Sequence, residues 1–393
     1  MLVDNGSEIN KKNSDQNTAL LLSASNGNFG VVQILIKERS SINVRNNNNN
    51  TALHLAALNG HTNVVQLLVD NGSEISEQNS DQNTALHLAA SNGHFGVVQI
   101  LIKKRSSINL RNNNNNTALH LAALNGHINV VQLFVDNGSE ISEQNSDQNT
   151  ALLLAASNGH INVVQYLHQK GCRINQKDST NCTALHLAAL DGHLNVVQYL
   201  HQKGSRINQK DSQNLTALHY AASKGHINVV QFLIQNGYQI NEKDSKNNTP
   251  LHYAAMKGTI CVVKYLILNG NQNRLRNING YTPLHIAVVN GHIDVVQFFV
   301  KNVPGSLDLD SKGNTPLHIA VLFNHTNIVK YFIEQQVNLN EGNTYGCTPL
   351  HIAARDNHLE IVKSLITNLA NINAHDSIFN NWNMEGLLFT MPL

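Results

Sequence analysis

Histidine is the side chain in this sequence with the widest capacity for chemistry. The chain has 21 histidines among 393 residues, and imidazole acts as a metal ligand, a general acid or a general base near neutral pH. Eighteen of them occupy two recurring places in the sequence. One set follows Thr-Ala-Leu or Thr-Pro-Leu: His54, His87, His120, His186, His219, His252, His285, His318 and His351. The other set follows glycine or asparagine: His61, His94, His127, His160, His193, His226, His292, His325 and His358. This regular placement predicts a structural role and not a metal or acid–base site.

The other reactive residues give no sign of an active site either. His168, His201 and His375 lie outside the two sets, and no histidine pair stands with a carboxylate at metal-ligand spacing. Signatures of acyl transfer, kinases and phosphate-binding loops are absent. Asp and Glu are scattered through predicted turns, where they form no paired acid and base. The sequence therefore predicts a protein that is not an enzyme and that holds no cofactor and no metal.

A threonine opens the same stretch of sequence every 33 residues, without insertion or deletion. These threonines are Thr18, Thr51, Thr84, Thr117, Thr150, Thr183, Thr216, Thr249, Thr282, Thr315 and Thr348. A fixed period of this length indicates one supersecondary unit stacked many times, in which each unit contacts only its neighbours. We therefore expect one array, although length alone would suggest two or three domains.

Each unit is predicted to hold two helices. In the unit that begins at Thr216, the threonine hydroxyl is placed to cap the first helix. Leu218 and Ala221–Ala222 form a narrow apolar stripe, and Gly225 can end that helix because glycine tolerates positive φ. Val229–Ile234 carries apolar residues at helical spacing, which indicates a second helix.

A polar turn, here called the finger, precedes each threonine. The residue two before the threonine is the one expected to need positive φ, and Asn or Gly is suited to it. It is Asn49, Asn115, Asn181, Asn214, Asn247, Gly280, Gly313 and Gly346 in eight fingers. Gln16, Gln82 and Gln148 stand there in the other three. For those three fingers we expect a different or looser turn.

The unit resembles the ankyrin repeat. The likeness rests on the finger, Thr-Pro-Leu-His, Ala-Ala, Gly-His, Val-Val, Leu, Gly and an Ile-Asn exit, and it extends over residues 1 to 376. Complete Thr-Pro-Leu-His motifs stand at 249–252, 282–285, 315–318 and 348–351, and Ala replaces Pro in the earlier units. The resemblance implies an all-α repeat solenoid of helix–turn–helix pairs with β-turn or hairpin fingers. It also implies that the first histidine set bonds the threonine hydroxyl and neighbouring backbone.

This comparison divides the chain into three parts. Residues 1–17 form a partial repeat, residues 18–376 hold eleven registered units, and residues 377–393 form a degenerate C-terminal cap or tail. The last part is apolar enough to fold over the final unit as a cap, through Ile378, Phe379, Trp382, Leu387, Leu388 and Phe389. A tail that binds a partner is the alternative. The partial first repeat favours a fragment of a longer protein over a frayed first unit.

Composition argues against several partners and compartments. Net charge is +1 and only 13% of residues are charged, without a basic stripe, so no nucleic-acid binding is expected. No apolar run is long enough to insert into a membrane, and no signal peptide is evident. Cys172, Cys182, Cys261 and Cys347 lack metal or redox spacing. Reduced thiols favour the cytoplasm, with the nucleus as the alternative, and a monomer is expected.

Protein partners of ankyrin repeats bind the concave face, which the resemblance maps onto four positions of each unit. They are the residues one and three before each threonine and seven and eight after it. These positions are monotonous in the N-terminal half and varied in the C-terminal half. The candidate partner-binding residues are Leu215, Lys246, Met256, Tyr281, Lys312, Leu322, Phe323, Tyr345 and Arg355. Aromatic residues, Met and Arg are enriched at binding hot spots, whereas ordinary drift among repeats is the competing explanation.

The functional hypothesis is a non-catalytic protein–protein interaction scaffold that binds a protein partner on the concave face of the solenoid. The alternative is a regulatory or targeting arm of a larger multidomain protein, such as an ubiquitin-ligase subunit, a channel or a kinase. A metal-binding or catalytic protein is the third hypothesis, and the placement of the histidines argues against it. The identity of the partner and its pathway do not follow from the sequence.

Overall fold

Pairs of short helices repeat along the described part of the chain. The computed structural model describes residues 8–270 and 272–374, and in these ranges it contains 22 α-helices and no strand. Contacts divide the chain into two larger parts, residues 1–207 and residues 208–393. They are called unit 1 and unit 2 from here on, and a single 33-residue element is called a repeat. The chain is thus an all-α repeat solenoid, as its period predicts.

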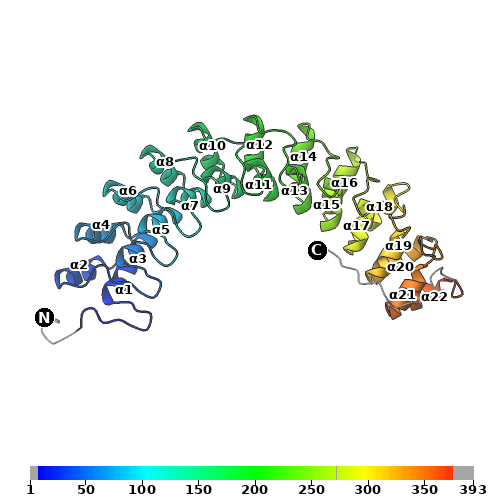
Figure 1. Cartoon of the computed structure of the whole chain (residues 1–393), viewed down its shortest axis with the longest axis horizontal. Helices are drawn as coiled ribbons and strands as arrows, with labels where there is room; N and C mark the ends of the chain where they lie inside the picture. The colour runs from blue at the N-terminus through cyan, green and yellow to red at the C-terminus, as the bar shows by residue number, and fades with distance from the viewer. Residues whose placement is uncertain (1–7, 271, 375–393) are drawn as a thin grey trace. The chain divides into compact units, whose positions relative to one another are not determined.

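Unit 1 contains six helix pairs in its described residues. The first helices of the pairs have seven residues each: α1 (Ala19–Ser25), α3 (Ala52–Leu58), α5 (Ala85–Ser91), α7 (Ala118–Leu124), α9 (Ala151–Ser157) and α11 (Ala184–Leu190). The second helices have nine: α2 (Phe29–Lys37), α4 (Thr62–Asp70), α6 (Phe95–Lys103), α8 (Ile128–Asp136), α10 (Ile161–Gln169) and α12 (Leu194–Gln202). Within this unit the first helices form one row and the second helices another (Figure 1).

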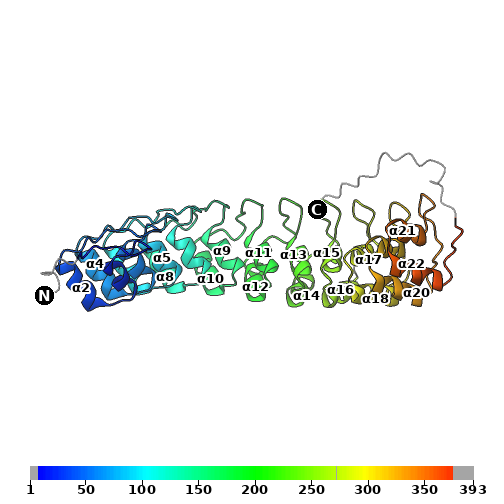
Figure 2. The same ribbon diagram turned by 90° about the horizontal axis from the view of Figure 1, so that it is seen from below.

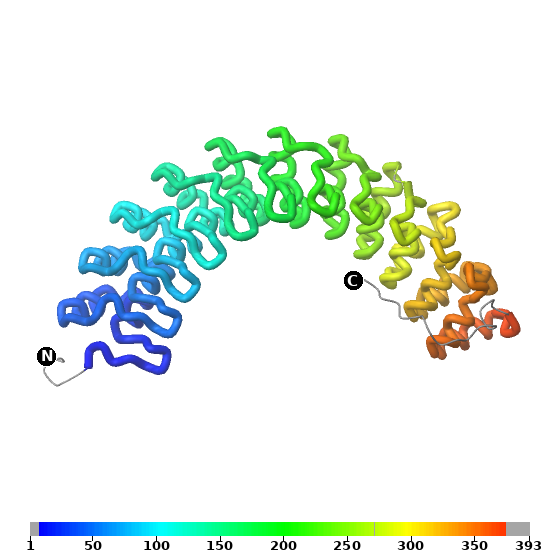
Figure 3. The backbone as a smooth tube through the Cα atoms, viewed as in Figure 1, coloured from blue at the N-terminus to red at the C-terminus, as the bar shows by residue number. Residues whose placement is uncertain are grey.

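Unit 2 contains five helix pairs in its described residues. The first helices are α13 (Ala217–Lys224), α15 (Pro250–Lys257), α17 (Pro283–Val289), α19 (Pro316–Leu322) and α21 (Pro349–Arg355). The second helices are α14 (Ile227–Gln235), α16 (Ile260–Leu268), α18 (Ile293–Asn302), α20 (Thr326–Glu334) and α22 (Leu359–Thr367). The backbone follows the same path in successive repeats of each unit (Figure 3).

The core of each unit lies between neighbouring repeats. Ala56, Ala57, Val64 and Val65 are at most 1% exposed, and the same places are buried in the repeats that begin at Thr84 through Thr315. Alanine on the first helix lets the next first helix approach closely, and paired valines on the second helix fill the seam between repeats. The apolar spacing in the sequence therefore identified the buried faces correctly.

Threonine caps the first helices, as expected from the sequence. The Thr51 hydroxyl accepts a hydrogen bond from the His54 backbone N–H, and the His54 ring in turn accepts from the Thr51 backbone N–H. This reciprocal capping box satisfies two backbone donors that a helix start would otherwise leave unpaired. Proline at the first helical position of α15 and of later first helices removes another unpaired donor.

The three glutamine fingers do not adopt a looser turn, so that expectation was wrong. Gln16, Gln82 and Gln148 have φ of 62°, 57° and 60°, which match the asparagine at Asn49 with 57°. The cause lies at the base of the finger. The Asn79 carboxamide oxygen accepts from the backbone N–H groups two and four residues later, at 3.1 and 2.9 Å. Those bonds hold the backbone of the finger in place whichever residue stands at the left-handed position.

The loop after α18 departs from the other repeats, as its missing glycine predicts. Val303 ends the helix in an extended conformation, and Gly305 takes the positive φ of 71°. The expectations for residues 1–7 and for the cap or tail at 377–393 lie outside the described residues. Within residues 8–270 and 272–374, no helix combines the length and the apolar character needed to cross a bilayer.

Candidate interaction surface

The fingers are joined to one another by backbone hydrogen bonds near their tips. In unit 2 the Ile278 N–H donates to the Lys246 carbonyl at 3.0 Å, and the Thr344 N–H donates to the Lys312 carbonyl at 3.1 Å. Figure 2 shows the fingers projecting on the side of the first helices. Between these two bonds the Ser311 hydroxyl donates to the Asn279 carbonyl at 2.9 Å. From Lys246 onward each finger is thus tied to the next, and side chains at successive tips are held at a fixed spacing.

Histidines of the first set can connect a first helix to the following finger, as His252 does. The His252 ring nitrogen Nδ1 lies 2.9 Å from the Thr249 hydroxyl, and Nε2 lies 3.1 Å from the Tyr281 carbonyl. Burial lowers the pKa of His252 to about 4, so the ring is neutral at pH 7. Since a carbonyl only accepts, Nε2 carries the proton and donates it. The threonine bond implied by the resemblance is therefore confirmed, and the ring's second bond carries the link to the next repeat.

Histidines of the second set tie a repeat to the preceding one, a role that the sequence left unassigned. His292 Nε2 lies 2.9 Å from the carbonyl of Met256 at the end of α15. Gly258 passes beside this ring with φ of +70°, and a Cβ atom there would lie 2.6 Å from His292 Nδ1. Glycine is therefore required at position 258 for two reasons, the left-handed turn and the room that the imidazole of the next repeat needs.

No metal site emerges from these histidines in the part of the chain that the structure describes. No group of three or more His, Cys, Asp or Glu side chains there is arranged to hold a metal ion. The ring of His252 shows why. Threonine engages its Nδ1 atom and a backbone carbonyl engages its Nε2 atom. A neutral ring in this state has no free lone pair for a metal.

Three of the candidate residues lie at finger tips. Lys246, Lys312 and Tyr345 are exposed, with Tyr345 at 51%. The backbone bond between Thr344 and Lys312 places the Lys312 and Tyr345 fingers side by side. Ile278, which is 60% exposed on the finger next to Lys246, also belongs to this row. Sequence reasoning missed Ile278 because it stands four residues before its threonine, outside the positions carried over from the family.

Leu215 is not a surface residue, so its expected place on the binding face was wrong. Its side chain is 8% exposed, and its backbone N–H donates to the Asp211 carboxylate at 2.7 Å. The residue just before the threonine forms the neck of the finger, where the carboxylate holds it. Tyr281 occupies the same position and is half-buried, stacked on His285 with ring centroids 5.9 Å apart.

The remaining candidates lie where first helices end. Leu322 is 42% exposed, and the adjacent Phe323 stacks on His325 with ring centroids 6.3 Å apart. Met256 is half-buried. Arg355 already pairs with Asp356 at 2.7 and 2.8 Å, which raises the pKa of the guanidinium. The arginine is exposed but partly neutralised by its neighbour, so it has less charge to offer a partner.

Two tyrosines brace fingers of unit 2, a function that sequence reasoning did not find. The Tyr220 hydroxyl donates to the Asp211 carboxylate at 2.7 Å, and the Tyr253 hydroxyl donates to Asp244 at 2.8 Å. Burial and the nearby carboxylate raise the pKa of the Tyr253 hydroxyl, which therefore stays protonated as a donor. The sequence does contain a pattern that could have predicted this bond, namely Asp at the base of the finger together with Tyr four residues after the threonine.

The comparison with protein families covers nearly the whole chain. The family model described as ankyrin repeats in three copies matches residues 1–79, 71–145, 134–211, 152–244, 218–308 and 302–376. The chain belongs to the ankyrin repeat family. Ankyrin repeats are generally protein–protein interaction modules, and the fold is typically a non-catalytic scaffold. The histidine network described above is how this member builds that framework.

A solved ankyrin repeat structure agrees with this fold. The human ASB11 ankyrin repeat domain is 24% identical, with a TM-score of 0.53, and the match covers 56% of this chain and 97% of that domain. At this identity the likeness concerns the fold alone. A search of curated proteins found no match to the sequence.

Proposed function

We propose that this ankyrin repeat chain is a non-catalytic scaffold that binds a protein partner on the concave face of unit 2. The surface concerned, here called the finger surface, comprises finger tips, the ends of first helices and the half-buried neck residue Tyr281. Its residues are Lys246, Met256, Ile278, Tyr281, Lys312, Leu322, Phe323, Tyr345 and Arg355. The observation that carries the proposal is exposed apolar and aromatic side chains standing on hydrogen-bonded fingers. Leu215 is left out because it is buried.

The rigidity of the fingers supports tight association. A partner that meets a mobile surface has to order it, and each immobilised side chain or loop costs free energy on binding. Here the backbone at Lys312 is already fixed by the Thr344 N–H, and the ring of His252 holds the Tyr281 backbone. The tips therefore present their side chains without a large ordering cost.

The types of residue on the finger surface also suit a protein partner. Tyr345 and Leu322 are large exposed side chains, and Phe323 replaces the Asn or Asp at the same position of every repeat in unit 1. Aromatic residues dominate the energetics of protein interfaces because they bury a large area at a small entropic cost. The corresponding tips in unit 1 hold only Asp, Asn and Thr. The partner is therefore assigned to unit 2.

The state of the cysteines suggests the cellular compartment in which the protein works. None of the four cysteines forms a disulfide, and Cys172 and Cys182 are buried. Free thiols suit a reducing compartment, the cytoplasm or the nucleus. We place the protein there as a monomer, whose finger surface is left open for a different protein.

The test is a triple substitution, Tyr281→Ala, Phe323→Ala and Tyr345→Ala, in the full chain. Proteins that bind the wild type are captured from native lysate, identified by mass spectrometry, and titrated against purified wild type and variant. We expect the affinity to fall by about 30-fold or more, because truncating a hot-spot aromatic typically costs about 1–2 kcal/mol.

A matched control removes three aromatic side chains from second helices. Phe29→Ala, Phe95→Ala and Tyr166→Ala change exposed or half-buried rings that lie off the finger surface. The control should bind like wild type. Equal binding by the finger-surface variant and wild type would remove the proposal, provided that both have the same helical circular dichroism.

A further inference from the structure

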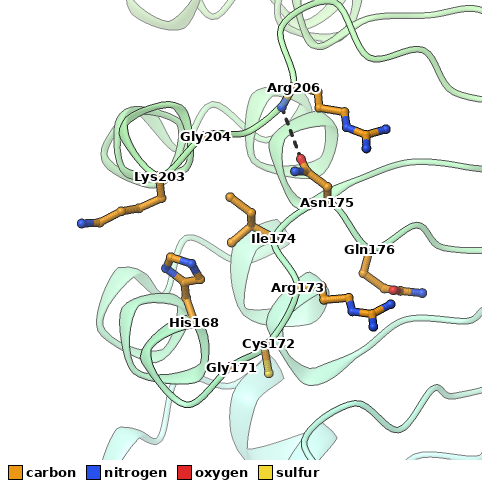
Figure 4. Close-up of a pocket in the computed structure, with 10 residues that line it drawn as sticks. All are labelled: His168, Gly171, Cys172, Arg173, Ile174, Asn175, Gln176, Lys203, Gly204 and Arg206. Atoms are coloured by element: carbon orange, nitrogen blue, oxygen red, sulfur yellow. Dashed lines mark hydrogen bonds between the residues drawn. The ribbon is translucent and has the colours of Figure 1, made fainter.

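An open pocket of about 550 Å³ lies in unit 1, between the repeats that begin at Thr150 and Thr183. It forms where α10 and α12 end and the chain turns toward its fingers. Figure 4 shows Ile174 between two groups of side chains, with His168 and Lys203 on one side and Arg173 and Arg206 on the other. The site is distinct from the finger surface, which belongs to unit 2.

The floor of this pocket is buried and its backbone is held in place. Ile174 is 8% exposed, and Cys172 is 6% exposed. Burial raises the pKa of the Cys172 thiol to about 11, so the thiol is neutral at pH 7. The Arg206 N–H donates to the Asn175 side-chain oxygen at 3.3 Å, a bond that joins the two repeats across the pocket (Figure 4).

The rim of the pocket is cationic and lacks an internal counter-charge. Arg173, Lys203 and Arg206 line it together with neutral residues, and no Asp or Glu does. These three exposed side chains form no salt bridge with any residue that the structure describes. Nearby Lys170, by contrast, lies 3.7 Å from Asp136. The positive charge around Ile174 is therefore available to an external anion.

The corresponding positions three repeats earlier in unit 1 serve as an internal control. Glu74 stands there where the later repeat has Arg173, so an acid replaces a cation. A pocket of about 620 Å³ beside Glu74 is closed by Arg45 of the preceding repeat, and this arginine forms an ion pair with Glu77. Of the two pockets, only the later one is lined by cations that have no acidic partner.

We propose that the cationic pocket, defined by Arg173, Ile174, Lys203 and Arg206, binds an acidic segment of a partner protein. Guanidinium groups match carboxylates in paired hydrogen bonds. The cations stand on both sides of an apolar floor in Figure 4, which fits an extended segment with an apolar residue among Asp or Glu better than one compact anion. Three separated cations in a chain of net charge +1 form no track for a nucleic-acid backbone.

Fluorescence anisotropy of a labelled peptide tests the site. The probe is a short fluorescein-labelled peptide of alternating Glu and Leu, titrated with the full chain at low salt. Arg173→Glu with Arg206→Glu should weaken binding by about tenfold or more, as expected for losing two favourable charge contacts and gaining repulsion. Arg173→Gln with Arg206→Gln should give a smaller loss in the same direction.

The matched control makes the same change of net charge elsewhere in unit 1. Lys37→Glu with Lys103→Glu reverses two exposed cations at the ends of α2 and α6 and should leave the affinity nearly unchanged. A peptide with Gln in place of Glu should not bind wild type. The alanine variants of the finger surface should bind the probe normally. A negative result for the cationic pocket can therefore be told apart from a negative result for the scaffold proposal.

Several outcomes would overturn the proposal. They are no binding of the Glu peptide by wild type, equal binding by the Arg173→Glu and Arg206→Glu variant, or an equal loss in the Lys37→Glu and Lys103→Glu control. Tight binding of a phosphoserine peptide without binding of the Glu peptide would also overturn it, because the ligand would then be a phosphate. Circular dichroism of each variant confirms that the helices are retained.

Discussion

Units 1 and 2 share one framework but differ in what they expose. Thr51 and His54 in unit 1 make the same capping box as Thr249 and His252 in unit 2. Finger tips in unit 1 carry small polar residues, whereas Tyr345 in unit 2 is a half-exposed aromatic ring. The comparison separates the residues that the repeat needs for folding from those that are free to recognise a partner.

The largest effect should come from pH, because the histidine framework is common to both units. Burial lowers the pKa to about 4 for His54, His120, His219, His252 and His285, against 6.5 for an exposed histidine. The unfolded chain therefore binds more protons than the folded chain between about pH 6.5 and pH 4. Stability is full above pH 6.5 and is lost as the pH falls toward 4, by about 1–2 kcal/mol per histidine at pH 5.

Urea denaturation followed by circular dichroism between pH 7.5 and pH 4.5 measures this loss. Both units should weaken together, because both contain such rings. A midpoint that stays constant over this range would show that the histidines are not buried in the neutral form.

Core truncation should be the next largest effect and should not distinguish the units. Phe134 in α8 and Phe332 in α20 are both 0% exposed. Phe134→Ala and Phe332→Ala should each lower the free energy of unfolding by about 3–5 kcal/mol. Phe95→Ala is the control, since Phe95 is 41% exposed and should cost much less. A large difference between the two core variants would contradict the shared framework.

The glycine beside the imidazole should give an intermediate effect. Gly258→Ala places a Cβ 2.6 Å from His292 Nδ1 at φ of +70°, and Gly93→Ala places one 2.5 Å from His127 Nδ1 at +71°. Each should destabilise by about 2 kcal/mol or more, because the left-handed strain and the clash with the ring add together. Gly237→Ala at φ +84° meets nothing within 4 Å and should cost only the left-handed strain, about 1–2 kcal/mol. Thermal unfolding ranks the three variants, and an equal cost at Gly237 would exclude a role for the ring contact.

The smallest effects on stability should come from the exposed tips of the finger surface. Lys246→Ala and Tyr345→Ala remove exposed side chains, so each should change the free energy of unfolding by less than about 0.5 kcal/mol. Tyr281→Ala is the contrasting variant, since it removes the ring stacked on His285 and should destabilise measurably. If Tyr345→Ala unfolds the protein as readily, the tip belongs to the framework and not to a binding surface.

The framework could be predicted from the sequence because it repeats in phase with the fold. Thr51, His54, Ala56 and Val64 recur at the same places of the 33-residue period, and their roles follow from spacing and residue type. The boundary at Ile207 could not be predicted, because the period continues through it without interruption.

The candidate surface was harder to predict because exposure depends on the geometry of the finger. Leu215 shares its position with half-buried Tyr281, and only the bond to Asp211 shows that this place is a neck. Gln82 adopts the positive φ of the turn because the Asn79 side chain, three residues earlier, accepts a hydrogen bond from the backbone of the finger. That bond outweighs the conformational preference of glutamine itself. The charges of the cationic pocket come from Arg173 and Arg206, one period apart, so their proximity could have been read from the repeat.

Cross-linking of the full chain to its captured partner tests the central claim most directly. Lys246 and Lys312 on the finger surface and Lys37 and Lys103 on second helices of unit 1 are all exposed, so an amine-reactive cross-linker has equal access to both sets in the free protein. The account predicts that cross-links to the partner come from Lys246 and Lys312. Cross-links confined to Lys37 and Lys103 would contradict it.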